Sequence, residues 1–220
     1  MKAIAIAFLD SPPSSLPRWE GGPVPAGCVF WQKAMSGKAF YTVAADHYNC
    51  AVGAHTHKIT LPAERAHELK DTIVFMAEAN YVATEEVPGI PTLERSPGAV
   101  AYAPMEGAGF EPDLVLVAAK PAQAMLIYEA AIKAGASSGL AGALGRPACA
   151  VLPLAMTSRE ASLSLGCKGN RTFTGLPDEE LYVAIPGDKW QAVLEKLDEV
   201  DEANAAMERH YQERKAQIRP

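Results

Sequence analysis

The sequence lacks any long hydrophobic run. Its N-terminal stretch MKAIAIAFLD is apolar for only a few residues before Asp10, which is too short for the core of a signal peptide or for a membrane span. Basic residues are also too few for a nucleic-acid surface, since 20 lysines and arginines stand against 26 aspartates and glutamates, with a net charge of -6. Phosphate binding needs a basic face. These absences predict a cytoplasmic protein that binds neither membranes nor nucleic acids.

Cysteine is scarce, and the familiar cofactor motifs are missing. The four cysteines form no CxxC pair and have no ferredoxin-like spacing. The glycine-rich runs GALGRP and GCKGNR lack the GxGxxG and GxxxxGK[ST] patterns that hold phosphates. Without a secretory signal, such cysteines are more often reduced thiols, metal ligands or redox groups than disulfides. Any site they form must be assembled from distant segments.

One stretch, VAADHYNCAVGAHTHKI, carries more chemistry than a connection between elements needs. It follows an expected strand, AFYTV, and contains His47, Cys50, His55 and His57. On an extended segment, His55 and His57 would point to the same face because they are two residues apart. A thiolate with imidazoles suits zinc or another transition metal. The alternatives stay open: His55 and His57 as exposed loop residues, and His47 as a partner of the backbone at a strand end.

Cys28 is expected in the first turn of a helix, CVFWQKAMSG, that closes at Gly37. Free backbone N–H groups and the helix dipole favour thiolate over thiol at that position. Cys28 therefore has a physical reason to be a ligand or a nucleophile. A small buried apolar residue is the alternative.

The order of expected elements is similar in the two halves of the chain, about 1–110 and 111–220. Each half begins with an apolar strand and contains the string CAV, at Cys50 and at Cys149. The pattern predicts an α/β fold, a single compact domain of residues 1–220 built from two similar halves, with a mixed sheet and a long C-terminal helix. Cys50 and Cys149 would take equivalent places and face a common cleft. The run CAVLPL is expected to be a buried strand.

Several runs are similar to those of a known family. They are GCVFWQKAMSGKAF, DHYNCAVGAHTH, FEPDLVLVAAKPAQAM, GCKGNR and DEELYVAIP, together with the late Cys149. They cover nearly the whole chain and resemble the uncharacterised prokaryotic domain-of-unknown-function family 169. The resemblance implies a single α/β domain and almost nothing about activity. It also implies that cysteines matching those of this chain recur in the family, which are Cys28, Cys50, Cys149 and Cys167.

We therefore expect a functional site in a cleft between the halves, lined by the four cysteines, with His47 and Asn49 beside them. Four thiolates are the ligand set of an iron–sulfur cluster. Glycine-flanked turns suit such a cluster because backbone N–H groups can reach its sulfides. Zinc bound by Cys50 and histidines is an alternative, and so is a site without metal.

These expectations describe a cytoplasmic metal-binding or iron–sulfur protein with a redox or accessory role. Its partner would be a small molecule or a redox protein, and self-association is left open. The alternative is a non-catalytic ligand-binding or regulatory protein with structural cysteines, whose cleft uses Arg171 and the glycine-rich turns. Arg171 could hold a carboxylate or phosphate, or lower the pKa of Cys167. The sequence does not decide whether the protein is an enzyme.

Overall fold

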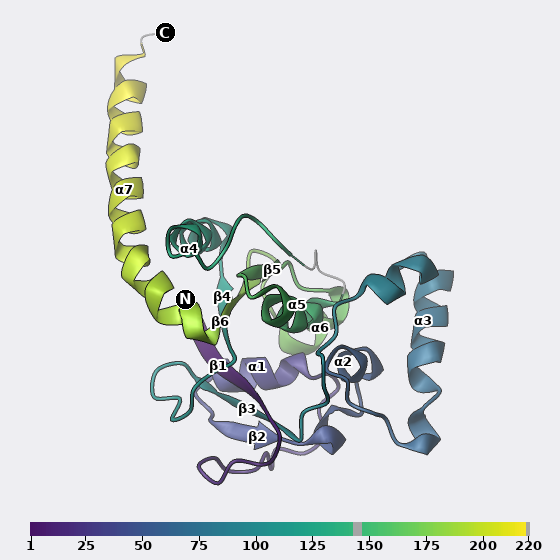
Figure 1. Cartoon of the computed structure of the whole chain (residues 1–220). Coiled ribbons are helices and arrows are strands. Elements are labelled where there is room, and N and C mark those ends of the chain that lie inside the picture. The colour runs from purple at the N-terminus through teal and green to yellow at the C-terminus, as the bar shows by residue number, and fades with distance from the viewer. Residues whose placement is uncertain (143–146, 219–220) are drawn as a thin grey trace.

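A computed structural model describes residues 1–142 and 147–218 as one antiparallel sheet with helices on both faces (Figure 1). The strands are β1 (Lys2–Leu9), β2 (Phe40–Thr42), β3 (Ala99–Pro104), β4 (Leu114–Ala119), β5 (Ser162–Ser164) and β6 (Leu181–Pro186). They lie in the order β2-β3-β1-β4-β6-β5, and each neighbouring pair is antiparallel. The expected mixed sheet is therefore wrong, because an apolar strand pattern does not record strand direction. The α/β class is confirmed.

Helices cover the sheet from both sides. They are α1 (Cys28–Met35), α2 (Ala51–Thr56), α3 (Glu68–Glu78), α4 (Pro121–Lys133), α5 (Val151–Ser158), α6 (Lys168–Thr174) and α7 (Trp190–Gln217). Short 3₁₀ turns lie between them, η1 (Ala44–His47), η2 (Ala63–Arg65), η3 (Thr84–Gly89), η4 (Ala148–Ala150) and η5 (Gly187–Lys189). None of the helices in residues 1–142 and 147–218 is both long enough and apolar enough to cross a bilayer.

Strand β4 shows why the central strands are apolar on both faces. Its alternate residues Leu114 and Leu116 join the core beneath α1 and α5, whereas Val115 and Val117 join the core beneath α4 and α7. All six residues of β4 are buried. Side chains alternate between the faces of a strand, so covering both faces requires the unbroken apolar run LVLVAA.

The sheet is divided between the two halves of the chain. Strands β2, β3 and β1 form one side, and β4, β6 and β5 form the other. The halves meet at the antiparallel pair β1–β4, where Ile4 lies opposite Leu116. In each half the first strand is innermost, the third lies next to it, and the second forms the outer edge.

Two expected elements differ from the structure. The run CAVLPL does not form a strand, because it spans η4 and the start of helix α5. A short apolar run fits either structure, and Pro153 is tolerated there because it lies in the first turn of the helix. The run LPAERAHELKDTIVFMAEANYV predicts one helix with Pro62 at its start, but it forms η2 first and then α3 from Glu68. The run GALGRP falls partly on residues 143–146, which lie outside the described residues.

Candidate cysteine site

Each of the four cysteines stands where a helical segment begins. Cys28 is the first residue of α1, and Cys149 lies in η4, which leads directly into α5. Cys50 and Cys167 are the N-cap residues of α2 and α6. Backbone N–H groups that lack partners inside a helix point towards its start, so each thiol lies near hydrogen-bond donors.

The cysteines occupy matching positions in the two halves. Cys28 is the first residue of α1, the helix before strand β2, and Cys149 lies just before α5, the helix before strand β5. Cys50 is the N-cap of α2, which follows β2, and Cys167 is the N-cap of α6, which follows β5. The expected equivalence of Cys50 with Cys149 is therefore wrong. The repeated string CAV does not mark equivalent places, because it enters α2 in the first half and α5 in the second.

Three of the sulfur atoms accept hydrogen bonds from identified donors. Cys50 Sγ accepts from the Gly53 N–H, and Cys167 Sγ accepts from the Asn170 N–H, both at 3.3 Å. The Thr56 hydroxyl donates to Cys149 Sγ, also at 3.3 Å. Donors of this kind stabilise a thiolate or a negatively charged cluster.

The four thiols are neighbours that interact electrostatically. The pKa of Cys28 is raised to about 12, chiefly by burial; the Asn170 side chain acts in the opposite direction, and the nearby Cys50 and Cys167 add to the rise. Burial also raises the pKa of Cys149 well above its usual value, with Cys50 as the next cause. The pKa of Cys50 is raised for the same reason, burial first. Without a bound cation these three side chains are neutral thiols at physiological pH.

The thiols do not form a ready-made site for one metal ion. Among residues 1–142 and 147–218, no group of three or more histidine, cysteine, aspartate or glutamate side chains is placed to hold a single ion.

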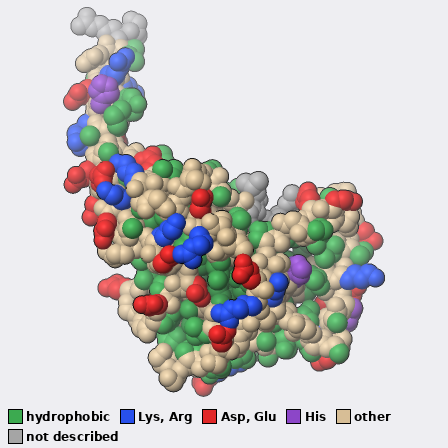
Figure 2. Space-filling view, viewed as in Figure 1, with side chains coloured by type: hydrophobic (Ala, Val, Ile, Leu, Met, Phe, Trp, Pro, Cys, Tyr) green, Lys and Arg blue, Asp and Glu red, His purple; other side chains and the backbone are tan. Residues whose placement is uncertain are grey.

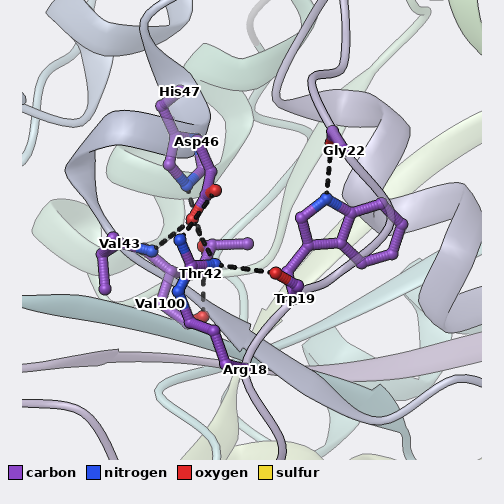
Figure 3. A network of polar contacts seen from close by, with 8 residues as sticks. All are labelled: Arg18, Trp19, Gly22, Thr42, Val43, Asp46, His47 and Val100. Atoms are coloured by element: carbon purple, nitrogen blue, oxygen red, sulfur yellow. Dashed lines mark hydrogen bonds and ion pairs between the residues drawn. The ribbon is translucent and has the colours of Figure 1, made fainter.

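His47 is fixed by a polar network on the sheet edge (Figure 3). Its Nε2 lies 2.8 Å from Thr42 Oγ1, and the Thr42 hydroxyl donates to the Val100 carbonyl at 3.3 Å. The neighbouring Asp46 accepts from the Val43 N–H at 2.7 Å and pairs with Arg18 at 2.7 Å. Burial, helped by the Arg18 charge, lowers the pKa of His47 to about 4. This network holds the turn η1 that leads into Cys50.

His55 and His57 do not share a face of an extended segment, and that expectation is wrong. His55 lies half-buried within helix α2, and His57 follows it as the buried C-cap. The His57 ring packs on Phe8 and His47, with ring centroids 5.5 and 6.2 Å apart. Neither His57 ring nitrogen has a hydrogen-bond partner among the described residues. Burial, then the charge of His47, lowers the pKa of His57 to about 3.

The polar groups of Asn49 are used within the fold. Asn49 is exposed, its Nδ2 donates to the Val24 carbonyl at 3.1 Å, and its Oδ1 accepts from Arg65 at 3.0 Å. The side chain therefore ties the start of α2 to two other segments and does not join the cysteines.

Arg171 is likewise occupied by backbone. Its guanidinium donates to the carbonyls of Leu165, Pro177 and Glu180 at 2.5, 2.5 and 2.9 Å. Arg171 therefore joins the loops before and after α6 by hydrogen bonds. Because its guanidinium is used in this way, it is poorly placed to hold a substrate carboxylate or phosphate.

Asn170 is a site residue that the sequence reading missed. It is 1% exposed, lies beside Cys28, and donates from Nδ2 to the Tyr182 hydroxyl at 3.4 Å. Its Oδ1 is buried and has no hydrogen-bond partner in the part of the chain that the structure describes. One feature of the sequence could have indicated it: Asn170 lies three residues after Cys167, just as Gly53 lies three residues after Cys50.

The chain matches the family described as uncharacterised ArCR, DUF169, over residues 1–196. It belongs to the DUF169 family. This confirms the resemblance seen in the sequence. The uncharacterized protein MJ0308 of Methanocaldococcus jannaschii is 30% identical over 118 residues, which are 53% of this chain and 51% of that protein. The chain thus matches about half the length of this curated relative. No solved structure matches.

A cavity of about 340 Å³ in this DUF169 protein lies apart from the cysteines. It opens between α5 and the segment before β3, with Phe8 and Met156 among its apolar walls and Arg95 and Arg159 among its charged ones. Arg95 forms an ion pair with Asp10, and Arg159 forms one with Asp188. None of the described residues lining the cavity is a cysteine.

Residues 135–139, GASSG, match the GxSxG pattern of hydrolases but not its structure. That pattern needs its serine on a sharp turn between a strand and a helix. Ser137 instead follows helix α4, is buried, and donates to the Gly139 carbonyl at 2.6 Å. It therefore shapes a loop.

Proposed function

We propose that this DUF169 protein binds one iron–sulfur cluster through its four cysteines and has a redox or accessory role in the cytoplasm. The observation that carries the proposal is the adjacency of Cys28, Cys50, Cys149 and Cys167, two from each half, each at the start of a helical segment. Four cysteine thiolates are the complete protein ligand set of a [2Fe–2S] or [4Fe–4S] cluster.

The electrostatics of the site favour a bound positive centre. Four adjacent thiolates would repel one another and would be costly to bury. Yet the N–H groups of Gly53 and Asn170 and the hydroxyl of Thr56 are directed at sulfur, where they stabilise negative charge. Iron resolves this conflict, because it replaces the thiol protons and leaves the sulfurs as hydrogen-bond acceptors.

The number of cysteines favours a cluster over zinc, because four thiolates are the usual ligand set of a cluster. Zinc is commonly bound by cysteine together with histidine. Of the histidines that zinc would recruit beside Cys50, His47 already uses its Nε2 with Thr42.

The ligand count also bears on the role. With four cysteines bound, a cubane cluster leaves no iron without a protein ligand and therefore no open position for a substrate. Electron transfer or delivery of the cluster suits such a site better than catalysis at iron. Cys50, Cys149 and Cys167 are half-buried, so a cluster bound by them would lie within reach of a redox partner at the surface.

Anaerobic purification and reconstitution with iron and sulfide test the proposal. We expect brown protein with iron and acid-labile sulfide in equal amounts, and loss of both in each single variant C28S, C50S, C149S and C167S. The control variant H55A alters a half-buried residue of the same helix α2 and should keep the cluster. Circular dichroism checks that each variant is folded. Wild-type protein that stays colourless, or that binds zinc stoichiometrically and excludes iron, contradicts the proposal.

A further inference from the structure

The outer part of helix α7 continues a stripe of residues that begins in the core. Val193 and Val200 are each 1% exposed and pack with Leu197 in the core beneath α4 and α7. The stripe continues along the part of α7 that projects beyond the sheet and its covering helices, with alternating steps of three and four residues. Its positions are 193, 197, 200, 204, 207, 211 and 214. Such spacing is the heptad pattern of helices that pair along one seam.

This seam has no partner within the described chain once α7 leaves the body. Met207 is 46% exposed and Tyr211 is 61% exposed. Residues 201–217 are exposed except Asn204, which is half-buried where it meets α4. Figure 2 shows this part of the helix standing clear of the rest of the molecule. An isolated helix of this length gains little stability in water, so a packing partner would stabilise it.

The charges along the projecting helix indicate what that partner is. From 197 to 208 every charged side chain is acidic, whereas Arg209, Arg214 and Lys215 make the following segment mainly basic. A second copy running in the opposite direction places the acidic segment of one helix against the basic segment of the other. An anionic membrane surface is a poor match, because the helix carries more acidic than basic side chains.

We propose that residues 201–217 pair with the same segment of a second copy in an antiparallel arrangement. In the register that matches apolar with apolar positions, Met207 packs on Tyr211 of the second copy, a favourable sulfur–aromatic contact. Asn204 then faces Arg214 of the second copy. The Nδ2 of Asn204 already donates to Glu129 at 2.9 Å, so its Oδ1 accepts from the arginine.

The flanking positions follow from the same register. Asp201 of each chain lies beside Lys215 of the other, which gives two symmetric ion pairs. Glu208 meets its own copy at the twofold axis, a like-charge contact that weakens the pairing. The seam is short, so the dimer is concentration-dependent rather than permanent.

Sedimentation velocity of the full chain over a wide concentration range tests the pairing. We expect a reversible monomer–dimer equilibrium that M207E shifts to monomer. The control A216E adds the same charge on the outer face of the same helix and leaves the equilibrium within about twofold of wild type. E208Q strengthens the dimer by removing the like-charge contact. Wild-type protein that stays monomeric throughout overturns the proposal, as does a dimer that M207E leaves unchanged.

A charge exchange tests the direction of the helices. D201K and K215E each weaken the antiparallel dimer, and the double variant D201K/K215E restores it. In a parallel pair, Asp201 would instead face Lys196 of the second copy, so the double variant would not be restored. Failure of restoration therefore overturns the antiparallel arrangement. The cysteine site is remote from this seam in the sequence, so all these variants should keep wild-type iron content if a cluster is bound.

Discussion

Cys50 and Cys167 make the same hydrogen bond at matching places in the two halves of the molecule. Each sulfur accepts from the backbone N–H three residues further on, Gly53 and Asn170 respectively, at 3.3 Å in both cases. Both cysteines cap a short helix that follows the second strand of their half. An N-cap side chain commonly accepts the N–H of the third helical residue, so the shared geometry marks equivalent places in the two halves.

The first prediction concerns the space around Cys50. A methyl group at Gly53 would lie 3.0 Å from Cys50 Sγ, whereas one at Gly169 would meet only Phe173 at 3.8 Å. Both glycines are helical, where alanine is intrinsically favoured by about 1 kcal/mol. We therefore expect G53A to lower the iron content after reconstitution by at least about half, a rough figure for one crowded ligand of four.

Variant G169A is the matched control for G53A and should bind as much iron as wild type. Iron and sulfide analysis of the two variants decides the matter. Equal iron in G53A and wild type would show that the contact with Cys50 does not matter for the site.

The second prediction concerns thiol reactivity in metal-free protein. Burial raises the pKa of Cys28 from 9.0 to about 12. At pH 8 its thiolate fraction is then about a thousandfold below that of an ordinary thiol, so alkylation slows by a similar factor. Mass spectrometry of iodoacetamide-labelled peptides measures the rate. Protein labelled in denaturant is the control, and equally fast labelling of Cys28 in folded protein contradicts the prediction.

The third prediction is loss of stability in acid. Burial lowers the pKa of His47 to about 4 and that of His57 to about 3, below the usual 6.5. Since the unfolded chain binds these protons first, stability is complete above pH 6.5 and falls as the pH approaches the folded-state values. Each histidine contributes a slope of about 1.4 kcal/mol per pH unit between about pH 6 and pH 4.

Urea unfolding of metal-free protein at several pH values measures this slope. The variants H47Q and H57F should each lower the pH dependence of the unfolding free energy by the contribution of one histidine. A free energy of unfolding that is flat from pH 7 to pH 5 in wild-type protein is the outcome that rules the prediction out.

The fourth prediction separates a structural Arg171 from a ligand-binding one. Its guanidinium bridges the carbonyls of Leu165, Pro177 and Glu180. A lysine keeps the charge but cannot make these diverging bonds. We expect both R171A and R171K to lower the free energy of unfolding by about 2–3 kcal/mol. An R171K variant as stable as wild type would indicate that only the charge matters.

The sequence predicted the local elements better than their arrangement. The expected strand AFYTV contains β2, and the expected helix CVFWQKAMSG contains α1. The direction of the strands could not be predicted, because side-chain alternation is the same in parallel and antiparallel sheets. The run CAVLPL was assigned to the wrong element because a short apolar stretch suits a buried helix as well as a buried strand.

For the site, the sequence identified the thiols but not their surroundings. The four cysteines stood out because they are few. The roles of Asn49 and Arg171 depend on backbone carbonyls of neighbouring loops, whose positions are set by the fold and not by a local sequence pattern. Asn170 was missed for the opposite reason, since a polar residue after a glycine reads as a surface turn until the fold buries it.

We propose that the four cysteines jointly hold one iron–sulfur cluster. X-ray absorption at the iron edge of anaerobically purified wild-type protein is the decisive measurement for this proposal, because it reports the neighbours of iron. Our account predicts sulfur as the only ligand of iron, together with a short iron–iron distance that requires a cluster. It also predicts that C50S and C167S lose the iron–iron signal alike. Iron surrounded by nitrogen or oxygen, or sulfur-bound iron without an iron neighbour, would contradict it.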